Sequence, residues 1–123
     1  MESGKRILIA DDDPDIIDLL ESYFTRAGFK VTAKINGKDA LQAAEAEKFD
    51  LVLLDVMMPY IDGYHGASEI SSRLGSDAPK IIIMTSRDVS SEKGIALLSG
   101  ATDVVQKPFT LDELDAKINA ALG

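Results

Sequence analysis

The sequence contains no cysteine. This absence excludes disulfides, a thiolate nucleophile and cysteine-ligated zinc sites, and it fits a reducing compartment. Long hydrophobic runs are lacking near the start, where the apolar run at residues 7–10 is too short for a signal-peptide core or a membrane span. We therefore expect a cytoplasmic location and no membrane contact.

Positive charge is scarce, since 13 Lys and Arg stand against 21 Asp and Glu, for a net charge of −8. Such a chain would repel phosphate backbones, so we expect no direct nucleic acid binding by it. Its 123 residues, 46% of them hydrophobic and 28% charged, predict one folded domain over residues 1–123.

Short apolar runs alternate with segments of helical spacing. The runs predict strands at residues 5–10, 30–35, 51–54, 80–84 and 103–105. The helical segments are residues 14–27, 38–47, about 64–74, about 91–99 and 111–122. The third run is apolar throughout, as is typical of a central parallel strand that helices cover on both faces. The pattern predicts an α/β doubly wound parallel sheet, in which ligands bind beyond the carboxyl ends of the strands.

Capping signals support these boundaries. Asp13 and Thr110 are suited to helix starts, and Gly28 and Gly100 to helix ends in the left-handed conformation. The Asn36-Gly37 pair could form a hairpin turn, but the alanine-rich helical pattern that follows predicts a helix start instead.

Acidic residues follow two of the predicted strands. Asp11, Asp12 and Asp13 come after the first, and Asp55 comes after the third. Carboxylates that converge at one edge raise each other's pKa unless a cation neutralises them, and an oxygen-only cluster open to water suits Mg²⁺. We interpret Asp13 as a helix cap and the other three as metal ligands.

Asp55 directly follows the most apolar strand of the chain. Burying a charge there without a functional role would cost folding free energy. A carboxylate beside a metal ion is a competent nucleophile toward phosphorus. Lys107, after the fifth strand, can neutralise a phosphoryl oxygen, and Thr85, after the fourth, can donate a hydrogen bond to another. Taken singly, Lys107 is more often a solvated lysine and Thr85 an ordinary strand-end residue, but their shared position favours function.

Five motifs together resemble the receiver domains of bacterial and archaeal response regulators. They are ILIADDDP at residues 7–14, DVMMP at 55–59, DG at 62–63, IMTS at 83–86 and KPF at 107–109. The resemblance implies a flavodoxin-like five-stranded parallel sheet of order 2-1-3-4-5 with five helices in three layers. It implies a phosphorylation-activated switch whose output face is the fourth helix, fifth strand and fifth helix. The implied phosphodonor is a sensor histidine kinase or histidine phosphotransfer protein, and an output partner or domain is implied as well.

The resemblance also implies residue roles. Asp55 would be the phosphoacceptor; Asp12 and Asp55 would contact Mg²⁺ directly, and Asp11 directly or through water. Met57 would add its backbone carbonyl, and Mn²⁺ could substitute. The domain would be a regulatory phosphoacceptor rather than an enzyme, assisting its own phosphorylation and dephosphorylation.

Around the phosphoacceptor, Lys107 matches the family's lysine, with a cis peptide to Pro108, and Thr85 matches the hydroxyl residue that moves toward the phosphoryl group. Ser86 matches the small residue that leaves room for the donor. One position departs from the family: Val104 stands where many receivers carry an aromatic switch residue. Coupling between phosphorylation and the output face is then expected to run through Thr85, the loop after it and the fourth helix, or to be weak.

Four further residues complete the interpretation. Met57 and Arg87 resemble positions that control the access of water to the acyl phosphate. His65, the one histidine, is interpreted as a surface or capping residue. Gly94 costs the fourth helix roughly 1 kcal/mol relative to alanine and predicts a mobile helix.

Four alternative kinds of protein fit the sequence less well. An EF-hand lacks its turn glycine at Ile16 and its glutamate at Ser22, and a P-loop lacks the upstream glycine before Lys5. A flavin binder would need a phosphate-binding loop where this chain has three acids. The main enzyme alternative is an aspartate-dependent Mg²⁺ phosphohydrolase, which places its nucleophile in the first strand's Asp-x-Asp and adds a cap insertion.

Overall fold

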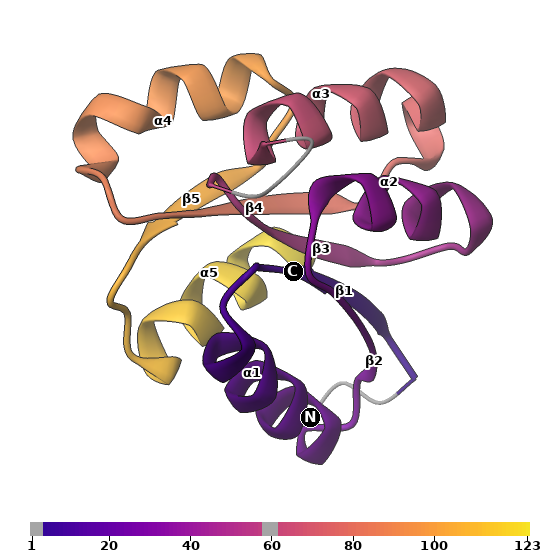
Figure 1. The fold of residues 1–123 in the computed structure, drawn as a ribbon, viewed down its shortest axis with the longest axis vertical. Helices are drawn as coiled ribbons and strands as arrows, with labels where there is room; N and C mark the ends of the chain where they lie inside the picture. Colours follow the sequence, from indigo (N-terminus) through magenta and orange to yellow (C-terminus); the bar gives the residue numbers. More distant parts are fainter. Residues whose placement is uncertain (1–3, 58–61) are drawn as a thin grey trace.

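Five parallel strands form one sheet in the part of the chain that the computed structural model describes, residues 4–57 and 62–123. They are β1 (Arg6–Ala10), β2 (Lys30–Lys34), β3 (Leu51–Asp55), β4 (Lys80–Thr85) and β5 (Asp103–Gln106). Their order across the sheet is β2-β1-β3-β4-β5 (Figure 1). This order confirms the α/β prediction and the strand order implied by the resemblance.

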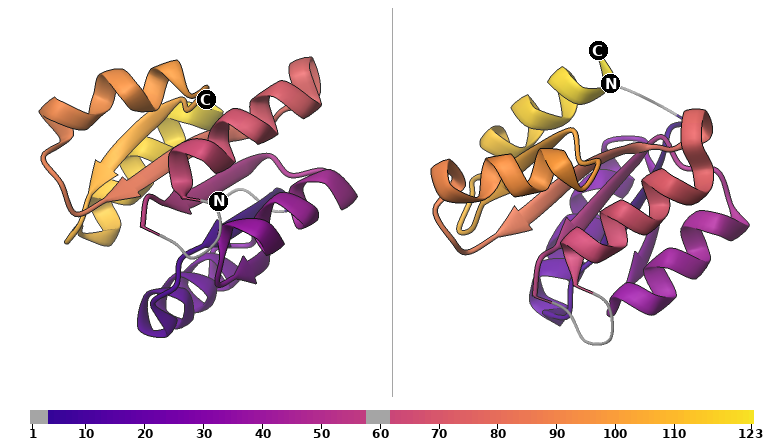
Figure 2. Two further views of the ribbon diagram at one scale, coloured as in Figure 1. Left: turned by 45° about the horizontal axis from the view of Figure 1, so that its top comes forward. Right: turned by 90° about the horizontal axis from the view of Figure 1, so that it is seen from above.

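Within the described residues, five α-helices cover the two faces of the sheet, giving three layers. They are α1 (Pro14–Arg26), α2 (Gly37–Ala46), α3 (Gly63–Leu74), α4 (Val89–Leu98) and α5 (Leu111–Leu122). The helices α1 and α5 lie on one face, and α2, α3 and α4 lie on the other (Figure 1, Figure 2). Within the described ranges, no helix is long and apolar enough to cross a membrane.

The core is divided between the two faces of the sheet. Successive residues of β3 point to opposite faces: Val52 packs in the cluster under α2, α3 and α4, and Leu53 packs in the cluster under α1 and α5. Every residue of β3 is buried, which confirms its central position.

The helices differ in how much apolar surface they bury. Helix α1 buries Ile17, Leu20 and Phe24, whereas α4 buries only Glu92 and Ala96. A fully buried Leu, Ile or Phe side chain contributes about 1.5–3 kcal/mol relative to an exposed one. Apolar packing therefore holds α4 less firmly than α1.

The predicted helix caps are confirmed. The side chain of Asn36 accepts from the N–H of Asp39, so the Asn36-Gly37 pair starts a helix and not a hairpin. Thr110 opens a full capping box, and Gly28 and Gly100 adopt φ of 99° and 97°. These positive φ values are accessible to glycine at little cost.

Candidate functional site: the carboxyl edge of the sheet

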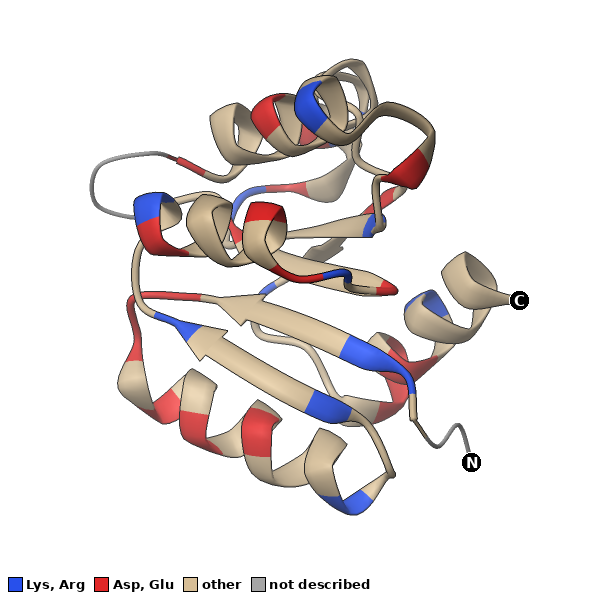
Figure 3. Cartoon of the chain, turned by 90° about the vertical axis from the view of Figure 1, so that its right-hand side faces the viewer, with Lys and Arg blue, Asp and Glu red and all other residues tan. Residues whose placement is uncertain are grey.

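The carboxyl ends of four strands bring polar side chains to one edge of the sheet. Asp11 follows β1, Asp55 ends β3, Thr85 ends β4 and Lys107 follows β5. In Figure 3, red acidic residues gather on the loop after β1 and continue along α1. The edge therefore holds acids, one lysine and one hydroxyl from segments far apart in the sequence.

Three carboxylates on this edge form a cluster. Asp11, Asp12 and Asp55 each offer an oxygen, and these oxygens all lie within 4.8 Å of one another. Asp11 and Asp55 are buried, whereas Asp12 is exposed, so the cluster is open to water on one side. Three hard oxygen donors with solvent access fit the preference of Mg²⁺, which keeps several of its waters.

Lys107 supplies the positive charge at the cluster. Its Nζ lies 2.6 Å from Oδ2 of Asp11 and 3.3 Å from Oδ1 of Asp55. The peptide bond from Lys107 to Pro108 is cis, as the resemblance implies. The sequence did not indicate that the lysine approaches Asp11 more closely than Asp55.

The electrostatics of the edge shift two pKa values. Burial raises the pKa of the Asp55 carboxyl to about 6; the charge of Asp11 adds to this, and Lys107 opposes it. Burial by itself would lower the pKa of the Lys107 ammonium, but its hydrogen bond to Asp11 and the charges of Asp11 and Asp55 outweigh burial and raise it. Lys107 is therefore charged at neutral pH.

Thr85 connects the edge to the loop before α4. Its side chain is 1% exposed, and its Oγ1 accepts the backbone N–H of Arg87 at 3.0 Å. Ser86, between them, is exposed. The hydroxyl proton of Thr85 is not used in this contact, so it can be donated elsewhere.

Gly63 is a site residue whose role the sequence did not reveal. A Cβ at this position would lie 2.5 Å from the backbone oxygen of Asp55. Its N–H donates to the carbonyl of Val56 at 3.0 Å, and Asp62 caps α3 beside it. Only glycine lets the start of α3 approach the end of β3 this closely. Met58 and Pro59, the last two residues of the DVMMP motif, lie outside the described residues.

Other residues singled out in the sequence lie on α3 and β5 or in the segments that adjoin α1 and β3. Asp13 caps α1, accepting the N–H of Asp15, as predicted. Met57 lies two residues after β3 with an exposed side chain. His65 lies on the surface of α3, 3.6 Å from Glu69. Val104 is fully buried on β5.

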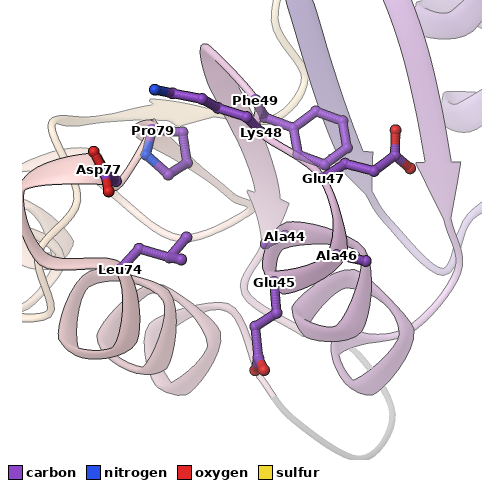
Figure 4. A pocket seen from close by; sticks show the side chains of 9 residues that line it. All are labelled: Ala44, Glu45, Ala46, Glu47, Lys48, Phe49, Leu74, Asp77 and Pro79. Atoms are coloured by element: carbon purple, nitrogen blue, oxygen red, sulfur yellow. The ribbon is translucent and has the colours of Figure 1, made fainter.

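One hollow in the surface adjoins this edge of the sheet, and another lies at the opposite edge. One, of about 280 Å³, lies beside Lys107 and is lined by Ile16, Leu19, Ser86, Lys107, Pro108 and Phe109. Another, of about 240 Å³, lies between the end of α2 and the segments that enter β3 and β4, where Phe49 and Pro79 lie (Figure 4). The second is at the amino ends of the strands, away from the acids.

Known proteins match nearly the whole chain. A family model for the response regulator receiver domain matches residues 7–119. The chain is 44% identical over 117 residues to the uncharacterized transcriptional regulatory protein YrkP of Bacillus subtilis, a match covering 95% of this chain and 49% of YrkP. The chain thus spans about half the length of that relative.

Solved receiver domains share the fold. The receiver domain of the sensor histidine kinase PA1611 from Pseudomonas aeruginosa, which has a magnesium ion in its active site cleft, superposes with a TM-score of 0.87 at 28% identity, covering 98% of this chain and 99% of that one. The BeF3-activated N-terminal receiver domain of RstA from Klebsiella pneumoniae superposes with a TM-score of 0.86 at 28% identity, covering 96% and 98%. With the family model matched from the first strand to the last helix, the chain belongs to the response regulator receiver domain family.

Proposed function

We propose that the chain is a phosphorylation-activated switch that accepts a phosphoryl group from a phosphohistidine onto Asp55. The observation that carries this proposal is the position of Asp55, a carboxylate 6% exposed at the end of the central strand. It lies beside Asp11 and Asp12, with the Lys107 ammonium 3.3 Å away. A buried acid so placed costs folding free energy, which a chemical role explains.

In the proposed step, a carboxylate oxygen of Asp55 attacks the phosphorus of the phosphohistidine. The new O–P bond forms as the P–N bond breaks, and the departing imidazole takes up a proton. Lys107 neutralises the charge on a phosphoryl oxygen. A Mg²⁺ ion held by Asp11, Asp12, Asp55 and the carbonyl of Met57 would polarise the phosphoryl oxygens, and Mn²⁺, which takes similar ligands, would substitute.

The same residues support the reverse change of state. Attack of water on phosphorus would break the O–P bond, release phosphate and regenerate the Asp55 carboxylate. Met57 lies two residues after Asp55, and Arg87 lies two residues after Thr85. We expect both side chains to influence the rate at which water attacks the phosphorus. The chain thus assists both steps while its role stays regulatory.

Phosphorylation would act on the output face, formed by α4, β5 and α5. The phosphoryl group adds about −1.5 to −2 charges at pH 7 and requires new hydrogen-bond donors. The Thr85 hydroxyl would turn toward it, and the loop at residues 86–90 would follow. Because Val104 has no ring to rotate and is fully buried, this loop is the expected route to α4.

A protein phosphodonor, either a sensor histidine kinase or a histidine phosphotransfer protein, is supported by the apolar hollow beside Lys107. Exposed apolar surface next to reacting atoms favours docking of a protein. YrkP, which is named as a transcriptional regulatory protein, is about twice as long as the match, so an output domain or partner is proposed. That one domain fills residues 1–123, and that the chain acts in the cytoplasm, stay predictions.

The phosphohydrolase alternative is not favoured. Its nucleophile would belong to an Asp-x-Asp after the first strand, where Asp11 is held by Lys107 and Asp13 caps a helix. The family match also places the chain among receiver domains.

The proposal is tested by labelling the chain with acetyl phosphate in the presence of Mg²⁺. Mass spectrometry should find one phosphoryl group on Asp55, and Asp55→Asn should abolish labelling. Asp13→Asn is the matched control, because asparagine caps a helix as well as aspartate does and labelling should persist. Full labelling of Asp55→Asn at another residue would refute the assignment.

A further inference from the structure

One buried carboxylate lies away from the acidic edge. In the described part of the chain, the buried polar and charged residues are Asp11, Asp55, Thr85 and Glu92, and the first three belong to the site. Glu92, in the first turn of α4, is 9% exposed. Because a buried carboxylate is costly unless it is paired, its partners indicate its role.

The first partner of Glu92 is Tyr64, near the start of α3. The Tyr64 hydroxyl donates a hydrogen bond to Oε1 of Glu92, joining two helices across 28 residues of sequence. Burial, and then this hydrogen bond and the charge of Glu92, raise the pKa of Tyr64, so the phenol remains a donor at neutral pH. A hydrogen bond to an ionised acceptor is of the stronger class.

The second partner is Arg87, in the loop before α4. Its Nη1 lies 3.8 Å from Oε1 of Glu92, a long ion pair with the arginine side chain largely exposed, so it is weak. The backbone N–H of Arg87 donates to the Thr85 hydroxyl. A continuous series of contacts therefore leads from Thr85 through Arg87 to Glu92 and Tyr64.

We propose that the Tyr64–Glu92 hydrogen bond holds α4 in its unphosphorylated position, and that phosphorylation of Asp55 weakens this hold through Arg87. The inference rests on the proposed function for its second half only. Helix α4 buries one alanine and this glutamate and packs a partly buried Val89 on the core, so the hydrogen bond is a substantial part of what fixes it.

The release follows from the contacts of Arg87. When the Thr85 hydroxyl turns to the phosphoryl group, the Arg87 N–H loses its acceptor and the loop moves. The added negative charge at the strand ends also attracts the guanidinium away from Glu92. Glu92 is then a buried charge with one partner fewer, which favours a position of α4 where water reaches it.

Amide hydrogen exchange of the full chain tests the hold without phosphorylation. Tyr64→Phe keeps the ring and removes the donor, so amides of α4 should exchange faster by about tenfold or more, the factor for losing one hydrogen bond to a charged group. Glu92→Gln keeps an acceptor for Tyr64 and should show a smaller increase. Tyr23→Phe is the matched control, because Tyr23 donates to Asp115 between α1 and α5 and its loss should leave α4 unchanged.

Beryllofluoride with Mg²⁺ tests whether phosphorylation releases α4. In the parent protein, amide exchange in α4 should rise toward the level of Tyr64→Phe. In Tyr64→Phe itself, the mimic should cause little further rise. Unchanged α4 exchange in Tyr64→Phe overturns the hold. Unchanged α4 exchange in the parent, with shifts around Asp55 showing that the mimic is bound, overturns the release. If the mimic does not bind the parent, the release and the proposed function both fail, while the exchange of the unphosphorylated variants still decides the hold.

Discussion

The Asp55 carboxyl is buried beside a second buried carboxyl, and its pKa is about 6 instead of 3.8. Between these values the folded state binds a proton that the unfolded state has released. This raised pKa therefore contributes stability that is fully present below about pH 3.8 and is lost as the pH rises through about 6. At neutral pH the ionised group destabilises the metal-free fold.

Asp55→Asn should accordingly raise the free energy of unfolding of the metal-free protein at pH 7, by up to about 3 kcal/mol from the size of the shift. The difference from the parent should shrink steadily toward pH 4. Urea denaturation with a chelator at several pH values measures this difference. An equal difference at pH 4 and pH 7 would contradict this account.

Single residues also show where prediction from sequence ends. That Asp11, Asp55, Thr85 and Lys107 meet was predictable, because parallel strands bring their carboxyl ends to one edge. The Tyr64–Glu92 contact was not, because it depends on how α3 and α4 are rotated toward each other, which helical spacing does not determine.

At the scale of helices and strands, the predicted elements are all present and their ends differ by one or two residues. Strands β3 and β4 each run one residue further, because Asp55 pairs with Met84 and Thr85 with Gln106 in the neighbouring strands. Helix α4 begins two residues earlier, because Asp88 accepts the N–H of Ser90. Such ends depend on partners that the local pattern does not show.

Helix α4 offers a direct test of its own stability. A Cβ at Gly94 meets nothing within 4 Å, so Gly94→Ala should add helix propensity without a clash and stabilise the protein by about 1 kcal/mol. Chemical denaturation measures the gain. Gly63→Ala is the contrasting variant and should destabilise, since its Cβ would strike the backbone of Asp55. A loss of stability in Gly94→Ala would show that this position has a packing role.

The whole molecule carries a net charge of −8, and three of its carboxylates, those of Asp11, Asp12 and Asp55, have oxygens within 4.8 Å of one another. Saturating Mg²⁺ should raise the melting temperature, because it binds the folded state and relieves this repulsion. NaCl at matched ionic strength, which only screens charge, should do much less. Asp12→Ala removes an exposed carboxylate and should lose most of the Mg²⁺ effect; a full effect in that variant would remove Asp12 from the ligand set.

Lys107 and Asp11 lie 96 positions apart in the chain, and yet their side chains are in contact. A ribosome therefore completes β1 and β3, with their acids, long before the lysine has been made. Until β5 and the residues after it are added, the carboxylates have no ammonium partner and the proposed acceptor lacks its cation. A nascent or truncated chain that ends before Lys107 would therefore lack a residue of the proposed phosphoryl-transfer site, and only molecules translated and folded past Lys107 would accept the phosphoryl group.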